Sequence, residues 1–308
     1  MTAATSARPV APALARAPRA GASRRREAGA AFLFLLPFLA VYAVFLVYPL
    51  GRGLWLSFRD WDLLVGDYGF VGTLNYQDLW TDPAFWRTLR NTLVFVAMTV
   101  PTMTVLALLL ALAVSGGGRV RSVLTSVFFL SSVFSVTVVT LIWQMVLSPD
   151  RGLIGPVFTA LGAEPINFLG SPRWAMPSIV LTTLWWGVGL PMALFLAALG
   201  SIPRELYEAA ELDHASRWTT FRRITLPSIR PTLLLVLVLQ IVGQFQVFGQ
   251  AQLMTNGPST RTLVQYIYET AFRDKLVGYG ATIAVALFAL MLVFSMLQLW
   301  LGRQGEER

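Results

Sequence analysis

The chain has 308 residues, of which 56% are hydrophobic and only 13% are charged, and its net charge is +8. Soluble domains carry about 25% charged residues, so the composition excludes an ordinary soluble enzyme and a disordered chain and indicates a protein dissolved in lipid. With no cysteine and one histidine, His214, we expect no metal site and no catalytic residues. The basic excess is expected to report membrane topology, with no nucleic-acid partner.

Six apolar stretches dominate the sequence. A helix needs about 20 mostly apolar residues to cross a membrane, and none of these stretches contains Asp, Glu, Lys or Arg. A charge at the centre of a span would cost at least about 2.5 kcal/mol. We therefore predict an all-α integral membrane protein with six transmembrane helices, at residues 32–50, 92–114, 123–147, 177–199, 233–254 and 281–301.

The regions outside these stretches differ in character. Residues 1–28 are rich in Ala, Pro and Arg and have no apolar face, so we interpret them as a disordered cytoplasmic tail, with residues 29–308 forming the membrane domain. The arginines of the tail either set topology alone or also contact anionic lipid. In the first connecting segment, 51–91, we expect residues 75–79 and 83–90 to form one or two short surface helices.

The distribution of charge predicts the orientation. If the N-terminus is inside, the inner segments hold 15 of the 24 Lys and Arg residues and 7 of the 16 acidic residues. The outer segments then have no net charge, so the whole basic excess lies on one side, as the positive-inside rule requires. Both termini are therefore predicted to be cytoplasmic. The inner segments are 1–31, 115–122, 200–232 and 302–308.

The polar residues narrow the class of protein. Ionisable side chains are absent from the predicted spans, which argues against an intramembrane enzyme and against a pump coupled through buried carboxylates. The single lysine, Lys275, lacks the glycines of a phosphate-binding loop. The sequence favours a translocation subunit that is driven by a partner. The alternative from another class is a six-helix channel or scaffold that needs no ATPase.

The inner loop 200–232 is the most informative segment. Pro203 suits a first helical turn, residues 204–212 can form a short helix, and Ser216 is a candidate N-cap for a second helix that Pro227 is expected to end. Helices this short are marginal alone in water, so we expect the loop to need a docking surface.

The loop also carries a sequence motif. Glu208-Ala209-Ala210, followed by Asp213, Ala215, Phe221 and Leu226-Pro227, resembles the EAA loop of ABC-importer permeases of the sugar type, related to the maltose-system and glycerol-3-phosphate-system inner-membrane proteins. Weaker matches follow in the order expected for that family. They include Tyr48-Pro49-Leu50, Asn75-Tyr76, Ser148-Pro149-Asp150, Phe245-Gln246-Val247-Phe248 and Met254-Thr255-Asn256-Gly257-Pro258.

The resemblance implies a type I ABC-importer permease fold in the bacterial inner membrane. It implies a second homologous permease subunit, two ATP-binding cassette ATPase subunits and an extracytoplasmic sugar-binding protein as partners. The chain itself would bind no cofactor, because the partner subunits would use the ATP. The implied cargo is a mono- or oligosaccharide, and a polyol or glycerol-3-phosphate is the alternative within the family.

In that family the EAA loop forms a coupling helix that sits in a groove of the ATPase. The residues that would take this role here are Glu208, Ala209, Ala210, Asp213, His214 and Ala215. The family usually has Gly where this chain has His214, and a glycine there would permit a positive φ. We interpret His214 as a substitution within the turn, since His tolerates that region better than most residues; a pH-sensitive contact with the ATPase is the alternative.

A substrate path is implied along the fourth and fifth helices. Gln240, Gln244 and Phe248 recur every four residues, so they are expected to share one helix face. Amides beside an aromatic ring suit a sugar. In maltose-type relatives, stretches equivalent to Trp185, Gly189 and Gln244 line the sugar site. Hydrogen bonding between helices is the alternative role for the glutamines. Pro191 is expected to kink the fourth helix.

Overall fold

The computed structural model describes residues 32–116, 119–255 and 257–303. The predicted tail, 1–28, lies outside these residues. The chain divides into two compact units, Met1–Arg52 and Gly53–Arg308. The described part of the first unit is helical from Phe32, with a π-helical turn at Ala43–Val47, and the helix ends in α2 (Tyr48–Leu56).

Gly53–Arg308 contains a short antiparallel hairpin that the sequence analysis did not predict. Strands β1 (Arg59–Asp62) and β2 (Gly66–Phe70) pair with a bulge between Asp60 and Trp61. The Asp62 carboxylate accepts the backbone N–H groups of Leu64 (2.7 Å) and Val65 (3.0 Å), which fixes the turn. These hydrogen bonds hold the pKa of Asp62 below its usual value.

Two long helices run through this unit and correspond to the second and sixth predicted spans. They are α4 (Pro83–Val114) and α16 (Val277–Arg303). The short helix α3 (Leu74–Thr81) confirms the surface helix expected at 75–79. The short surface helix expected at 83–90 is wrong, because Asp82 caps α4 and Pro83 occupies its first turn, so that segment is the start of the long helix.

The third, fourth and fifth predicted spans are broken helices. The pair α5 (Arg119–Ser131) and α6 (Val136–Leu147) bends by 99°, and the pair α8 (Ala175–Gly187) and α9 (Gly189–Gly200) bends by 48°. The third bent pair joins the helical run Arg217–Ser228 to α13 (Arg230–Phe245) at an angle of 66°, ahead of the predicted fifth span. Within that span, α13 stops before α14 (Gly249–Met254). Three helices of the described residues are long and apolar enough to cross a membrane, and up to six spans result if each bent pair is one span.

Two of these breaks have a local cause. Ser135 caps α6, and the hydroxyls of Ser131 and Ser132 bond to backbone carbonyls in the last turn of α5. Such bonds compete with helix continuation. The predicted kink at Pro191 is confirmed as the bend at Val188, because proline has no N–H to donate to the carbonyl four residues earlier.

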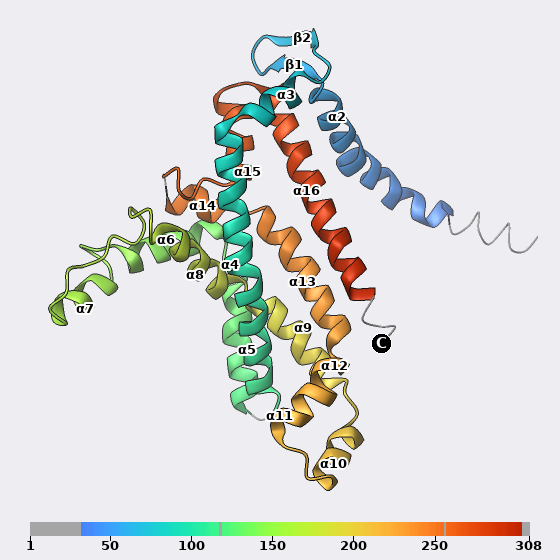
Figure 1. Cartoon of the computed structure of the whole chain (residues 1–308), viewed down its shortest axis with the longest axis vertical. Helices are drawn as coiled ribbons and strands as arrows, with labels where there is room; N and C mark the ends of the chain where they lie inside the picture. Colours follow the sequence, from blue (N-terminus) through green and yellow to red (C-terminus); the bar gives the residue numbers. More distant parts are fainter. Residues whose placement is uncertain (1–31, 117–118, 256, 304–308) are drawn as a thin grey trace, which may run out of the picture. The chain divides into compact units, whose positions relative to one another are not determined.

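The inner loop forms the end of the unit opposite the hairpin (Figure 1). It contains α10 (Arg204–Leu212), then α11 (Arg217–Thr220), a π-helical turn η2 (Phe221–Thr225) and α12 (Leu226–Ser228). The helical run Arg217–Ser228 ends one residue after Pro227, close to the predicted end, and the chain turns at Ile229.

The other short helices lie toward the hairpin end or on the arm that follows α6. They are α7 (Ile154–Ala160), α15 (Leu263–Tyr268) and the π-helical turn η3 (Glu269–Arg273). One apolar core is built around α4, α8 and α9 and includes Phe95, Met192 and Phe195. A second core joins the other end of α4 to α13, α15 and α16.

Candidate coupling surface and translocation path

Helix α10 presents two different faces. Tyr207 and Ala210 point inward: Ala210 is buried, and the Tyr207 hydroxyl lies 3.1 Å from the Thr225 hydroxyl. On the opposite face Glu208 and Ala209 are exposed, and Leu212 is 82% exposed. Ala209 and Leu212 therefore lie together on the exposed face of α10.

The turn after α10 is a Schellman motif. The N–H of His214 donates to the carbonyl of Glu211 (3.0 Å), and the N–H of Ala215 donates to the carbonyl of Ala210 (2.9 Å). His214 has φ = 51°, which confirms the prediction of a left-handed residue at this position. Asp213 and His214 are exposed, and Ala215 is half-buried. Five of the six predicted coupling residues therefore lie at an accessible surface, with Ala210 the exception.

The next helix begins as predicted. The hydroxyl of Ser216 accepts the N–H of Thr219 at 3.2 Å. Trp218 is 68% exposed and stacks on Phe221, with ring centroids 5.7 Å apart. Trp218 is therefore another exposed large apolar side chain of this loop, besides Leu212. The sequence analysis missed this tryptophan, although its position after an N-cap outside the apolar stretches was a usable signal.

The breaks in the bent helices meet one another. The indole N–H of Trp186 donates to the carbonyl of Phe134 (3.0 Å), and the Ser131 hydroxyl donates to the carbonyl of Trp185 (3.1 Å). These bonds join the α8–α9 break to the α5–α6 break. Gly249, at the start of α14, lies so close to Val136 that a Cβ there would stand 2.7 Å from a valine methyl carbon. Three interrupted helices thus converge at one junction.

The predicted path residues are not all on one surface. Gln244 donates to Gln240 at 3.0 Å, so these two share a face of α13 as expected, and the partner of each is on its own helix. The expectation that Phe248 continues this face is wrong, because α13 ends at Phe245, and Phe248 instead packs against Tyr268 with ring centroids 5.3 Å apart.

Trp185 and Gly189 belong to the junction. Trp185 is 39% exposed and makes an edge-to-face contact with Trp143. Gly189 is buried, and a Cβ there would lie 2.5 Å from the carbonyl oxygen of Phe128. Its position is explained by the close approach of α9 to α5.

At the opposite end of α4 a carboxylate connects three segments. Asp82 caps α4 and accepts hydrogen bonds from the hydroxyls of Tyr266 (2.5 Å) and Tyr279 (2.8 Å). Burial raises the pKa of Asp82, but the two hydroxyls and the helix N–H groups outweigh it and lower the pKa overall. Burial and the neighbouring Asp82 carboxylate raise the pKa of Tyr266 to about 12. This cluster holds α15 and α16 against the start of α4.

Among the described residues, no group of three or more His, Asp or Glu side chains is placed to hold a metal ion.

Comparison with known proteins places these features in a family. Residues 83–304 match the family model described as "Binding-protein-dependent transport system inner membrane component". The lactose transport system permease protein LacF of Rhizobium radiobacter is 33% identical over 284 residues, which cover 89% of this chain and 94% of that protein. The diacetylchitobiose uptake system permease protein NgcF of Streptomyces coelicolor is 34% identical, and the alignment covers 95% of this chain and 90% of that protein.

A solved structure shares the fold. A chain of a bacterial ABC transporter involved in the import of the acidic polysaccharide alginate superposes with a TM-score of 0.82 at 24% identity, covering 92% of this chain and 98% of that chain. The predicted importer-permease fold is confirmed.

Proposed function

Because this chain belongs to the family of inner membrane components of binding-protein-dependent transport systems, and is therefore a transporter subunit and not an enzyme, we propose that its cargo is a sugar or oligosaccharide. Relatives that align over most of the chain support this, since their names refer to lactose, diacetylchitobiose and arabinooligosaccharides. The multi-pass architecture in the inner membrane follows from the family, and the charge distribution supports cytoplasmic termini.

The transporter works as an assembly with a binding protein. The further partners proposed are a second homologous permease subunit and two ATPase subunits, which bind and hydrolyse the ATP. The binding protein delivers the sugar on the outer side. This chain supplies half of the path and one coupling surface, and it binds no cofactor of its own.

The coupling surface is the exposed face of α10 with the turn that follows it. Glu208 offers a carboxylate to a basic group of the ATPase, Ala209 permits close approach, and Leu212 buries its side chain in the partner groove. The observation that carries this assignment is the 82% exposure of Leu212 on a helix whose other face is anchored by Ala210 and Tyr207. Asp213, His214 and Ala215 hold the helix end in place.

The translocation path runs along the junction of the three helix breaks. Discontinuous helices interrupt the bundle near its middle, and transporters form substrate sites at such interruptions. The hydrogen bond from Gln244 to Gln240 leaves two polar groups for a substrate: the side-chain NH₂ of Gln240 and the side-chain carbonyl of Gln244. Trp185 adds an exposed aromatic face. Movement of α10 during the ATPase cycle would be transmitted through α9 to this junction.

The test is affinity purification of the full chain from its native membrane in mild detergent. The wild type is expected to bring a P-loop ATPase and a second permease with it. Glu208→Arg and Leu212→Asp are expected to lose the ATPase and keep the second permease. Glu164→Arg, an exposed acidic residue on the segment after α7, is the matched control and should keep both.

Retention of the ATPase by both α10 variants would refute the coupling assignment. If the wild type brings no ATPase at all, the ATPase-independent channel or scaffold becomes the better interpretation. The ligand of the co-purifying binding protein would identify the cargo and separate a sugar from a polyol or glycerol-3-phosphate.

A further inference from the structure

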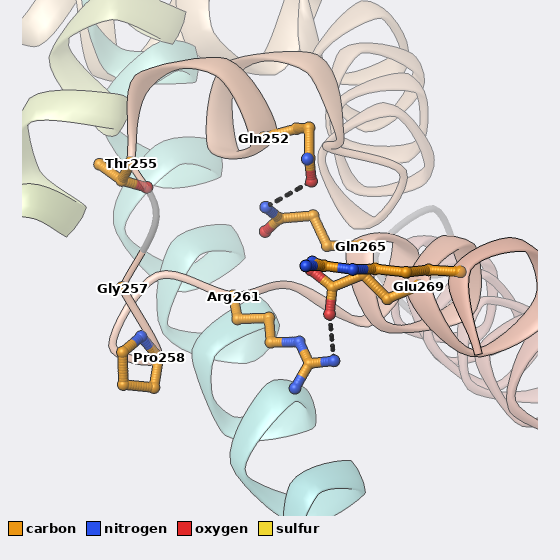
Figure 2. Close-up of a pocket in the computed structure, with 8 residues that line it drawn as sticks. Gln252, Thr255, Gly257, Pro258, Arg261, Gln265 and Glu269 are labelled. Carbon is orange, nitrogen blue, oxygen red and sulfur yellow. Dashed lines mark hydrogen bonds and ion pairs between the residues drawn. The ribbon is translucent and has the colours of Figure 1, made fainter.

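A polar pocket of about 380 Å³ lies beside α14 and α15. Figure 2 shows that its side chains come from α14, from α15 and η3, and from the connection between them. The volume falls within the range of small-ligand pockets. Its lining residues are Gln252, Thr255, Gly257, Pro258, Arg261, Gln265, Glu269 and Arg273.

The amide groups of the pocket have fixed orientations. Gln265 is buried, and its side-chain oxygen accepts the backbone N–H of Thr262 at 2.9 Å. An N–H can only donate, so the Gln265 nitrogen must point the other way, where it donates to the side-chain oxygen of Gln252 at 3.1 Å. Among the described residues, the NH₂ group of Gln252 and one N–H of Gln265 therefore have no hydrogen-bond partner.

The charged side chains that line the pocket carry an excess of positive charge. Arg261 pairs with Glu269 and lies over the ring of Tyr266, 4.7 Å from its centroid, which fixes the guanidinium in place. Its Nε atom is buried and has no hydrogen-bond partner in the described part of the chain. Arg273 is an exposed second guanidinium at the same pocket. Two arginines thus face one carboxylate, and the pocket carries one uncompensated positive charge.

We propose that this pocket binds an acidic sugar unit of the hexuronate type, an inference that rests on the proposed sugar-importer function. The sugar carboxylate pairs with Arg273, whose planar fork of donors matches it. The hydroxyls accept from the free N–H groups of Gln252 and Gln265, and one hydroxyl donates to the free oxygen of Glu269. One excess positive charge matches one carboxylate, whereas a phosphate dianion would need two.

The volume separates a sugar from a smaller acid. A single carboxylate group, such as an aspartate side chain of a docking protein, would fill only part of a 380 Å³ pocket and would leave the Gln252 and Gln265 donors without partners. A hexuronate carries the carboxylate and several hydroxyls on one ring, so it satisfies both ends of the pocket. This site lies outside the Gln240–Gln244 face of α13.

The test is saturation-transfer NMR titration of the full chain, purified with its membrane partners in lipid nanodiscs and washed free of binding protein. The probes are glucuronate, glucose, acetate and glucose 6-phosphate. Glucuronate is expected to bind about tenfold or more tightly than any of the others, because the pocket uses both its charge and its hydroxyls. Arg273→Gln and Gln252→Ala should each weaken glucuronate binding by about tenfold, and Arg151→Gln, an exposed arginine elsewhere, should not.

Each other outcome overturns the inference. Equal binding of acetate and glucuronate would mean that only a carboxylate is recognised, and tighter binding of glucose 6-phosphate would mean a phosphate site. No binding, or unchanged glucuronate binding in both pocket variants, would remove the site. The purification experiment tests the importer function separately, through recovery of the ATPase and identification of the binding protein's ligand. Failure of the importer function can therefore be distinguished from failure of the pocket proposal.

Discussion

The indole nitrogen of Trp186 lies 3.0 Å from the carbonyl oxygen of Phe134, and this one hydrogen bond connects the interruptions of two different membrane helices. The Phe134 carbonyl lies in the connection between α5 and α6, where no helical N–H follows to bond it. A carbonyl without a partner in hydrocarbon is costly. The bond therefore makes each break depend on the other.

Replacing Trp186 by phenylalanine should expose this dependence. Trp186→Phe keeps the ring but removes the donor, and we expect a loss of about 1 kcal/mol in unfolding free energy together with reduced transport. Thermal unfolding in detergent and ATP-dependent sugar uptake measure the two effects. Trp300→Phe, an exposed tryptophan near the end of α16, is the control. Equal behaviour of the two variants would contradict a connecting role for Trp186.

A methyl group at Gly189 should disrupt the same junction sterically. A Cβ there would stand 2.5 Å from the Phe128 carbonyl oxygen, so α9 must move away from α5. We expect Gly189→Ala to cost about 1–3 kcal/mol in thermal stability. Gly200→Ala lies in the same helix with no atom within 4 Å of the new carbon and should be neutral or slightly stabilising. A stable, fully active Gly189→Ala protein would rule out the tight contact.

His214 tests whether the coupling turn needs an imidazole or only its backbone conformation. Because φ is 51°, His214→Gly should relieve strain and keep ATP-dependent uptake, with a stability gain of up to about 1 kcal/mol. A β-branched residue is disfavoured in this region, so His214→Val should lower both stability and uptake. Complete loss of uptake in the glycine variant would show that the imidazole itself contacts the ATPase.

The tyrosine–aspartate cluster predicts how stability varies with pH. The pKa of Tyr266 is raised from 10.0 to about 12 in the folded protein, so folding favours the protonated hydroxyl. The resulting stabilisation is complete below pH 10 and is lost as the pH rises from about 10 to about 12. Asp82 behaves in the opposite sense: its lowered pKa gives stabilisation above its unfolded pKa of about 4, which is lost as the pH falls below that value.

Thermal unfolding measured across pH checks this cluster. Tyr266→Phe should flatten the loss of stability between pH 10 and about 12. Tyr68→Phe, an exposed tyrosine of β2, should leave the profile unchanged. An identical alkaline profile in the wild type and Tyr266→Phe would show that folding does not raise the pKa of Tyr266.

The sequence by itself determined the membrane class, the helical content, the short helix at 204–212, the N-cap at Ser216 and the left-handed residue His214. These depend on local properties: hydropathy, capping chemistry and the steric limits of φ. The hairpin at 59–70 was missed, although Asp62 followed by Gly66 and Gly69 among aromatic residues carried a turn signal.

Only the tertiary structure decided where three of the apolar stretches break and what surrounds each break. Both 123–147 and 233–254 contain polar residues, but their mean hydropathy still suits a membrane span, and that average cannot distinguish a straight span from a bent one. The breaks persist because distant groups satisfy the backbone: Ser131 bonds to Trp185, Trp186 bonds to Phe134, and the Thr262 hydroxyl donates to the Val247 carbonyl at 3.0 Å. Hydrogen bonds between residues so far apart in the chain leave no periodic trace in the sequence, and for that reason the junction of the three breaks became visible only in the folded protein.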